Sequence, residues 1–194
     1  MSGHNLGLKR RRAGQTDYAL RTKLLRSKIP QLVVRCSNRY MYAQVIRAEA
    51  AGDKVLTSAS GKELAKFDWR LGSASIPASY LVGYLVGLRA LELGITSAIL
   101  NMGLSTPTRG NKAFAVVSGA VEAGLDVPRK EDVLPPKDRL HGRHVAAYIM
   151  KVRENPADTR SQQFSKITGE GTEVDAEVQK VRESIKRAVP KGSG

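Results

Sequence analysis

The sequence is poor in the residues that build disulfide frameworks, metal centres and aromatic grooves. Its 194 residues include one cysteine, Cys36, which excludes a disulfide framework and a cysteine-built zinc site and favours a reducing compartment. Aromatic residues make up only 5%, so neither a core nor a ligand groove built on stacked rings is expected. The longest apolar run, 81–88, is far shorter than the ~20 residues that span a bilayer. With no apolar segment after the N-terminal charges, we expect no secretory signal and a soluble, cytoplasmic protein.

Acidic residues are almost absent from the first 40 positions. Ten basic side chains lie there against one acid, Asp17, which places nine of the fourteen excess positive charges in about a fifth of the chain. From residue 41 onward, 22 basic residues are mixed with 17 acidic ones. This asymmetry predicts an arm that binds a polyanion, although a tail that only promotes solubility would also show it. A membrane-surface helix is disfavoured because the arm lacks interleaved large apolar residues.

The first 60 residues predict an arm, a helix and three strands. Residues 1–15 have no apolar periodicity, so we expect a basic arm that is disordered until it binds. Thr16 is a candidate N-cap for a helix that reaches about Arg26, with Asp17 in its first turn. β-branched segments separated by turn residues predict strands over 32–36, 40–46 and 54–60. Their two tight connections predict an antiparallel meander.

The pattern changes to helices after residue 74. Ser75 and Pro77 open a predicted helix that Gly94 closes. Within it, Gly83 and Gly87 allow a close neighbour, which we expect to be the sheet. A strand over 97–100, a helix over 112–123 and a further short strand that begins at 127–128 predict a βαβ unit. The expected fold class is therefore α/β, with a mixed sheet that joins the antiparallel meander to a parallel βαβ part.

Composition and periodicity divide the chain into three predicted regions. These are the basic arm (1–15), an α/β domain (16–153), and a linker with a C-terminal helical extension (154–194). The stretch 157–171 is polar and contains glycine, which is typical of a linker. The extension is predicted because four apolar residues recur at helical spacing: Val174, Val178, Val181 and Ile185.

The loop from Gly103 to Lys112 is the strongest candidate for a phosphate cradle, because it joins a strand to a helix. Its glycines, however, are separated by six residues, whereas a P-loop has four between its glycines, followed by Lys-Ser/Thr. Two further interpretations stay open at this point. Arg109 and Lys112 could contact RNA phosphates, or the loop could be an ordinary connection.

Patterns for metal binding and catalysis are otherwise lacking. His141 and His144 could share a helix face, but a metal site needs further ligands that the sequence does not offer. We expect both histidines, with Arg143, to face RNA or solvent. The first two predicted strands carry no carboxylate, so metal-dependent nuclease chemistry is disfavoured. The sequence therefore predicts no enzyme activity, no metal and no cofactor.

Four stretches of sequence, in order, resemble a known family. Its motifs appear as Arg10-Arg11-Arg12 with Thr16-Asp17-Tyr18, Pro30-Gln31-Leu32-Val33-Val34-Arg35 with Ser37-Asn38, Pro77-Ala78-Ser79-Tyr80-Leu81 with Gly87-Leu88-Arg89-Ala90, and Gly103-Leu104-Ser105-Thr106-Pro107-Thr108 with Ala123-Gly124-Leu125-Asp126-Val127-Pro128. Together they resemble the archaeal and eukaryotic branch of the large-subunit ribosomal proteins that bind 5S rRNA, number eighteen in bacterial naming. The similarity covers about residues 10–150 and fades after about 155. Cys36 and Tyr40 depart from the polar or basic residues expected in the hairpin.

The resemblance implies a ribonuclease-H-like motif without an active site, in a structural constituent of the large ribosomal subunit. Its partners would be 5S rRNA, which it would anchor in the central protuberance, large-subunit rRNA and neighbouring ribosomal proteins. Arg10, Arg11 and Arg12 are expected to clamp phosphates, while Tyr18 or Tyr40 stacks on an unpaired base. Combined with the loop and histidine sites above, the candidate RNA-binding residues are Lys9, Arg10, Arg11, Arg12, Thr16, Asp17, Tyr18, Arg21, Arg26, Lys28, Arg35, Ser37, Asn38, Arg39, Tyr40, Arg109, Lys112, His141, Arg143 and His144.

Two other functions are compatible with the sequence. One is a general basic RNA chaperone without a fixed partner, which would bind unrelated RNAs with equal affinity. The other is a small enzyme that holds a phosphorylated substrate in the Gly103–Lys112 loop. A bound nucleotide, or thermal stabilisation of the protein by one, would support this function.

Overall fold

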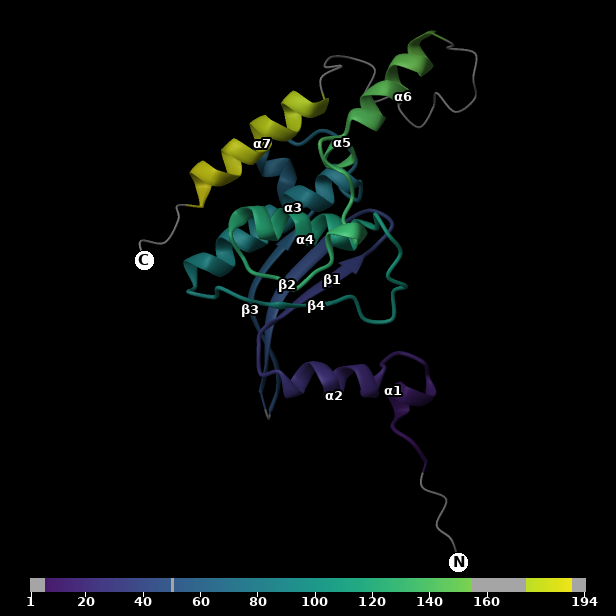
Figure 1. Ribbon diagram of the computed structural model, residues 1–194, viewed down its shortest axis with the longest axis vertical. Helices are drawn as coiled ribbons and strands as arrows, with labels where there is room; N and C mark the ends of the chain where they lie inside the picture. The colour runs from purple at the N-terminus through teal and green to yellow at the C-terminus, as the bar shows by residue number, and fades with distance from the viewer. Residues whose placement is uncertain (1–5, 50, 155–173, 190–194) are drawn as a thin grey trace, which may run out of the picture.

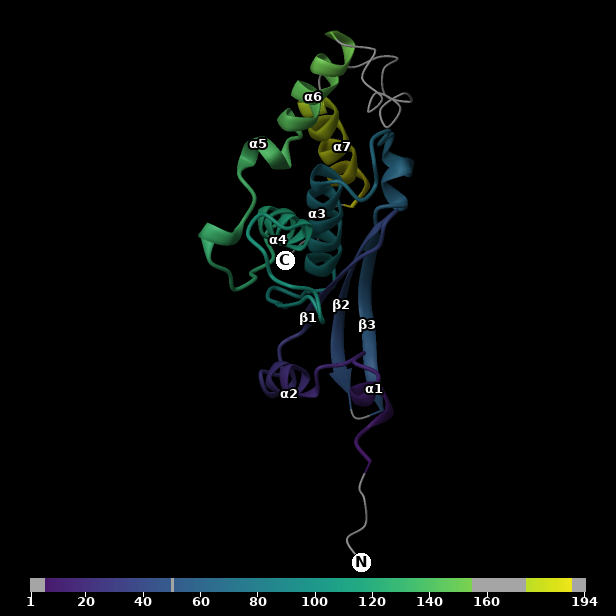
Figure 2. The ribbon, with the colours of Figure 1, turned by 90° about the vertical axis from the view of Figure 1, so that its right-hand side faces the viewer.

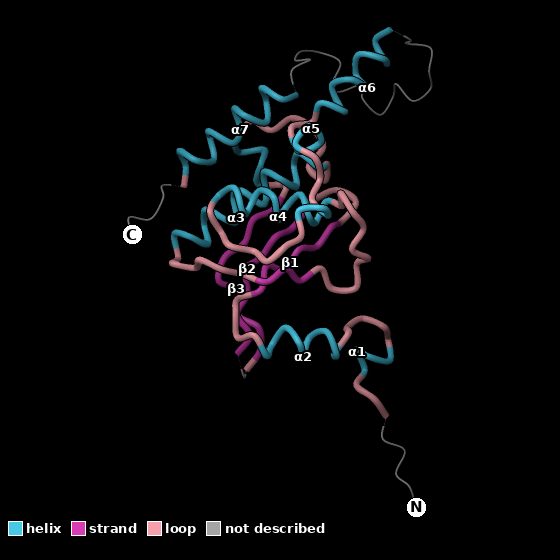
Figure 3. Tube along the Cα trace, viewed as in Figure 1, coloured by secondary structure: helices cyan, strands magenta, loops and turns pink. Residues whose placement is uncertain are grey.

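The computed structural model describes residues 6–49, 51–154 and 174–189. Figures 1 and 3 show an elongated molecule with a sheet at its centre, several helices above it and two further helices below. In chain order the elements are α1 (Lys9–Arg12), α2 (Tyr18–Arg26), β1 (Gln31–Cys36), β2 (Met41–Glu49), β3 (Gly52–Ser60), the 3-10 helix η1 (Glu63–Phe67), α3 (Ile76–Glu92), β4 (Ile99–Asn101), α4 (Lys112–Ala123), the 3-10 helix η2 (Glu131–Val133), α5 (Lys137–Leu140), α6 (Arg143–Glu154) and α7 (Val174–Ala188).

The sheet is mixed, as the sequence predicts. Its strand order is β3-β2-β1-β4, with β1, β2 and β3 antiparallel and β4 parallel to β1. The antiparallel meander is therefore confirmed, although β2 extends to Glu49 and β3 begins at Gly52. The predicted strand at 127–128 is wrong, because only an isolated parallel bridge between Ser97 and Asp126 forms there. The crossover between the parallel strands β1 and β4 contains α3.

The hydrophobic core lies between one face of the sheet and the helices α3 and α4 (Figure 2). Ser75 caps α3 by accepting a hydrogen bond from the Ala78 amide, with Pro77 in the first turn, as predicted. Gly124, at a φ of +113°, ends α4. Thirteen residues of α3 are buried, so it is the central helix of the domain. No helix in the described part of the chain is long and apolar enough to cross a membrane.

The two glycines of α3 face α4 and not the sheet, which corrects the prediction from the sequence. A Cβ at Gly83 would overlap with the Val116 carbonyl, and one at Gly87 would lie 2.8 Å from the Ala123 Cβ. Gly119 of α4 makes the reciprocal approach to Tyr80 of α3. Small residues on both helices therefore let the two backbones pack in direct contact. The sequence spacing indicated a close neighbour but could not identify it.

The predicted C-terminal helix is confirmed, and it packs on the domain. Val178, Val181 and Ile185 of α7 have no exposed surface and join the main core. At the same interface, the Tyr80 hydroxyl donates to Glu122 at 2.7 Å, and Glu122 pairs with Arg182 of α7. Burial is the main cause that raises the pKa of Tyr80 above its ordinary value. The predicted linker over 157–171 lies outside the described residues, and the division into three regions stays a prediction.

Candidate nucleic-acid interface

Four consecutive cations of the predicted arm form a single helical turn. The amides of Arg12 and Ala13 donate to the carbonyls of Leu8 and Lys9, both at 3.0 Å, and all four side chains of α1 are exposed. Lys and Arg are good helix formers, which explains the local structure. The arm is therefore helical over Lys9–Arg12, and the expectation that it is disordered until it binds stays a prediction. The first five residues of that arm lie outside the described residues.

Asp17, and not Thr16, caps the first long helix. Its carboxylate accepts hydrogen bonds from the amides of Ala19 at 2.9 Å and Leu20 at 3.0 Å, so α2 begins at Tyr18. The Thr16 hydroxyl instead accepts a hydrogen bond from Arg10 Nε at 2.9 Å. Threonine and aspartate are both favoured N-cap residues, so the sequence alone does not distinguish Thr16 from Asp17. The structure corrects the prediction of Thr16 to Asp17. Through Thr16, α1 is joined to the start of α2.

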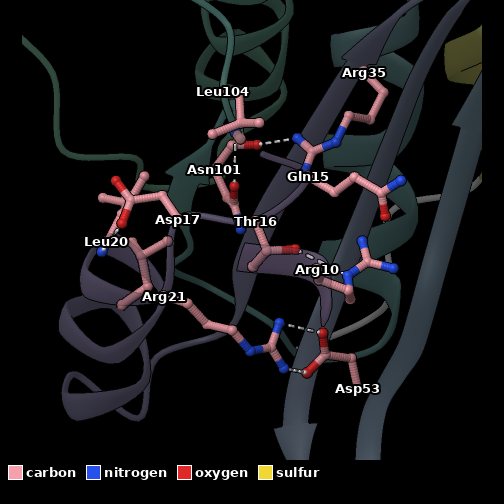
Figure 4. A pocket seen from close by; sticks show the side chains of 12 residues that line it. Arg10, Gln15, Thr16, Asp17, Leu20, Arg21, Arg35, Asp53, Asn101 and Leu104 are labelled. Carbon is pink, nitrogen blue, oxygen red and sulfur yellow. Dashed lines mark hydrogen bonds and ion pairs between the residues drawn. The ribbon is translucent and has the colours of Figure 1, made fainter. Parts of the chain in front are cut away.

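A cleft of about 300 Å³ lies between the arm, α2, β1 and the loop that follows β4 (Figure 4). Five of the candidate residues line it: Arg10, Thr16, Asp17, Arg21 and Arg35. The structure thus brings together side chains from the arm, from α2 and from a strand of the sheet.

Arg21 of α2 is occupied by an acid from the sheet. Its Nη1 and Nη2 donate to the two carboxylate oxygens of Asp53, on β3, at 2.9 and 2.7 Å. The hydrogen bond to Asp53 is the main cause that raises the pKa of Arg21. A bidentate pair of this kind fixes orientation as well as charge. Arg21 therefore positions α2 over the β2–β3 hairpin, a role that the sequence did not indicate because 32 residues separate the partners.

Arg35 joins β1 to β4 at the edge of the cleft. Its Nη1 donates to the carbonyls of Val34 at 2.8 Å and Asn101 at 3.0 Å, and burial lowers its pKa. The Asn101 side chain donates to Gln31 Oε1 at 2.8 Å and accepts from the Gly103 amide at 2.9 Å. Sequence reasoning missed Asn101. Its place directly after the strand predicted over 97–100, at the start of a loop that contains glycine, was the available signal.

The turn between β1 and β2 presents further candidates at the opposite end of β1 from Gln31. The Ser37 hydroxyl closes this turn, because it accepts from the Tyr40 amide at 3.0 Å and donates to the Tyr40 carbonyl at 2.8 Å. Asn38 and Arg39 are exposed. Tyr40 forms an edge-to-face pair with Tyr42, with ring centroids 6.5 Å apart. Tyr42 is exposed and was missed, although strand alternation with buried Met41 and Ala43 would have placed it on the open face.

The remaining candidates of α2 lie around its two ends. Tyr18, half-buried, is the first residue of the helix, and Arg26 is the last. Lys28 follows in a left-handed conformation, with a φ of +56°, between the helix and β1. Arg26 and Lys28 are exposed. The helix therefore ends before Pro30, and Lys28, two residues after its last residue, is where the chain turns toward the sheet.

The loop before α4 does not form a phosphate cradle. Within it, the amides of Gly103, Ser105, Thr108 and Gly110 all donate to oxygen atoms of this chain. At the start of α4, the Asn111 side chain accepts from an amide of the first turn. Arg109 forms a highly exposed ion pair with Asp132 at 3.3 Å, and Lys112 is half-buried. Several of the backbone donors that a phosphate would need are therefore engaged within the chain.

The two histidines lie on different elements, near α7 and far from α1 and α2 (Figures 1 and 2). His141 follows α5, and its Nδ1 lies 3.2 Å from both Asp175 and Gln179 of α7. Arg143 begins α6 and pairs with Asp138 at 2.8 Å. The pKa of His144 is lowered by burial first and by Arg139 second. Over the described ranges, no group of three or more His, Cys, Asp or Glu residues could hold a metal ion.

Most of the candidate arginines and lysines therefore fall into two classes. In the described structure, the basic side chains of α1, Arg26, Lys28 and Arg39 are exposed and form no ion pair with an acid. By contrast, Arg21, Arg109 and Arg143 each pair with an aspartate. Uncompensated cations can bind a folded polyanion such as RNA, and one of them, Arg10, lines a cleft that also exposes amide and apolar groups.

Comparison with known proteins gives consistent results. The family described as ribosomal large subunit proteins 60S L5, and 50S L18, matches residues 3–95. The large ribosomal subunit protein uL18 of Caldivirga maquilingensis is 43% identical over 186 residues, which cover 94% of this chain and 90% of the relative. The uL18 of Aeropyrum pernix is 37% identical, covering 95% of this chain and 88% of its own. That of Korarchaeum cryptofilum is 41% identical, covering 84% and 82%.

Proposed function

The chain belongs to the family of large ribosomal subunit proteins uL18, in its archaeal branch, and from this premise we propose that it binds 5S rRNA and helps to anchor it in the central protuberance. Family membership makes it a component of the large ribosomal subunit, with rRNA and ribosomal proteins as partners. The family consists of structural ribosomal proteins and is not a family of enzymes. The choice of 5S rRNA among ribosomal RNAs is the proposed step.

The observation that carries the proposal is the set of unpaired cations at one end of the molecule. The four basic side chains of α1 are exposed on one helical turn, and Arg26 and Lys28 are exposed at the other end of α2. Arginine can contact a phosphate with two parallel N–H groups, which suits it to the backbone of a folded RNA. We assign phosphate contacts to this group and not to Arg21, whose guanidinium Asp53 already holds.

Selectivity for one RNA is assigned to the rigid elements. The β1–β2 turn is fixed by the two hydrogen bonds of Ser37, so Asn38 and Tyr40 are presented in a defined geometry. RNA is recognised mainly through its shape and through bases that leave the helix and stack on side chains. Tyr40 and its neighbour Tyr42 provide aromatic surface for such a base.

Two alternatives are less well supported. An enzyme that binds phosphate in the Gly103–Lys112 loop would need free backbone amides, but four amides of that loop donate within the chain. A general RNA chaperone would need only the exposed cations. It differs from our proposal by its equal affinity for unrelated RNAs.

The proposal is tested by measuring the affinity for 5S rRNA and for a control RNA of equal length over a range of salt concentrations. Each lost phosphate contact should reduce the slope of log affinity against log salt by roughly 0.7–0.9. Replacing Arg10, Arg11 and Arg12 with alanine should therefore flatten the slope by about two units and preserve most of the preference for 5S rRNA.

A matched variant replaces three exposed lysines, Lys62 and Lys66 at η1 and Lys180 on α7, and so changes the net charge equally. This control should leave the slope close to that of the wild type. Equal affinity for both RNAs would contradict the proposed function and favour the chaperone. If the arginine variant kept its slope and lost its preference, the arm would read the RNA, and the assignment of selectivity to the β1–β2 turn would be wrong.

A further inference from the structure

The cleft beside the arm has a different chemical lining from the surface of α1, where four cations are exposed. Its walls include the apolar side chains Leu20 and Leu24 of α2 and Leu104 of the loop after β4. Its polar lining includes Arg35 and the amides of Gln15 and Asn101 (Figure 4). Arg10 of the arm, which we assign to phosphates, also lines the cleft. The cleft thus combines apolar walls with groups that donate and accept hydrogen bonds.

Arg35 and Asn101, two polar residues of the lining, are held in place by hydrogen bonds within the chain. Arg35 is fixed by the carbonyls of Val34 and Asn101, and Asn101 is fixed by Gln31 and the Gly103 amide. Gly103, at a φ of +65°, leaves space for the guanidinium, since a Cβ there would lie 3.0 Å from Arg35 Cζ. A planar group that is already ordered loses little entropy when a ligand stacks on it or binds to its edge.

The charges around the cleft disfavour a phosphate as its occupant. Two carboxylates, Asp17 and Asp53, line it, and the charge of Arg21 is matched by Asp53. The two other arginines of the lining already donate within the chain, Arg10 to the Thr16 hydroxyl and Arg35 to two backbone carbonyls. An anion inside would approach both carboxylates, and the apolar walls would offer it no hydrogen bonds. A flat, neutral ligand with hydrogen-bonding edges fits the lining better. In RNA this description applies to a nucleobase, and unpaired bases are known to stack on arginine planes.

We propose that the cleft between α2, β1 and the loop after β4 takes up one unpaired nucleobase of the bound RNA, with Arg35 as its stacking or edge partner. This inference rests on the proposed function and deepens it, because it assigns a base-binding subsite separate from the phosphate contacts of α1. The apolar side chains of α2 would cover the base, and the arm would hold the adjoining phosphates. The base is therefore read by elements that the hydrogen-bond network of Asn101 keeps rigid.

The test fills the cleft without changing any charge. Leu104 is 59% exposed, so Leu104→Trp can fold normally while its larger ring occupies the cleft. Leu93→Trp, at a residue that is 57% exposed and outside the lining, is the matched control. We expect Leu104→Trp to weaken 5S rRNA binding about tenfold with an unchanged salt slope, and Leu93→Trp to bind as the wild type does. Probing of the ribose 2′-hydroxyls should show one unpaired nucleotide losing its protection only with Leu104→Trp.

A second measurement keeps this inference separate from the choice of RNA. A single-stranded RNA oligonucleotide containing 4-thiouridine should crosslink, on irradiation, to peptides that carry Gln15 or Leu104 in the wild-type protein. Crosslinks confined to α1 and the β1–β2 turn would overturn the proposal, as would wild-type affinity and footprint for Leu104→Trp. Equal affinity of the wild type for 5S rRNA and the control RNA would instead contradict the function proposed above, while the crosslinks to the cleft would still support the subsite.

Discussion

The helices on the two sides of this molecule are held by different forces. The long helix α3 buries thirteen of its residues and contacts α4 through glycines, whereas α2 buries none. α2 is attached instead by the bidentate Arg21–Asp53 pair and borders an open cleft. Close packing of small and apolar residues stabilises the first region, while polar contacts at the surface only orient the second.

Because of this difference, one region of the molecule determines its stability and the other is available for binding. The region that carries the unpaired cations contributes little to the core, so its residues can be chosen for contacts with RNA. The packed region shows the opposite: its interfaces leave no space for added atoms at Gly83 or Gly119. Substitutions in the packed region should therefore change the free energy of unfolding, and substitutions around α2 should change other measurements. Three substitutions test this contrast, in order of decreasing effect on stability.

The largest effect is expected where α3 and α4 are in contact. Gly83→Ala should lower the free energy of unfolding by ~3 kcal/mol, because the added Cβ would overlap with backbone atoms of Val116 that cannot turn aside. Gly72→Ala is the matched control, since nothing lies within 4 Å of its position. Denaturant midpoints measure both. If the two variants were equally stable, the close approach of these helices would be incorrect.

A smaller loss is expected from the helix that joins the core from the C-terminal side. Val181→Ala should destabilise the protein by about 2 kcal/mol, because the side chain of Val181 has no exposed surface. Lys186→Ala, at an exposed position of the same helix, should change the midpoint little. The same denaturant titration compares them. Equal midpoints for the two variants would mean that the packing of α7 does not contribute to the stability of the domain.

The smallest effect on stability should come from the attachment of α2. Asp53→Asn should cost less than ~1 kcal/mol, because the pair is partly exposed, but it should release α2 from the hairpin. Trypsin should then cut faster after Arg21, Lys23 or Arg26 than it does in the wild type. Asp132→Asn, which breaks the more exposed pair with Arg109, controls for the loss of one carboxylate. A cleavage rate unchanged by Asp53→Asn would show that other contacts hold α2.

The features that were predicted correctly depend on neighbours in the sequence. The meander follows from β-branched segments and turn residues, and the start of α3 follows from Ser75 and Pro77. The predicted helix over 174–185 was found because its apolar residues repeat at helical spacing. Where two adjacent residues could serve equally, as with Thr16 and Asp17 at the start of α2, sequence reasoning chose the wrong one.

The candidate site was predicted less completely. The sequence located the basic segment, and the structure places several of its residues around one cleft, but it also separates His141, Arg143 and His144 from that cleft. Asn101 and Tyr42 were missed, since a lone asparagine at the end of a strand and a tyrosine within one are common in many folds. Their roles become visible only beside Arg35 and Tyr40.

The sequence by itself determined the excess of positive charge in the first 40 residues, the helical and strand periods, and the absence of a cysteine-built framework. The tertiary structure alone decided which cations stay free. Arg21 and Arg10 look alike in the sequence, yet Asp53 neutralises the first while the second meets only a hydroxyl. Periodicity and capping act over a few residues along the chain, whereas ion pairs and helix contacts join groups that the folded chain brings together from distant positions.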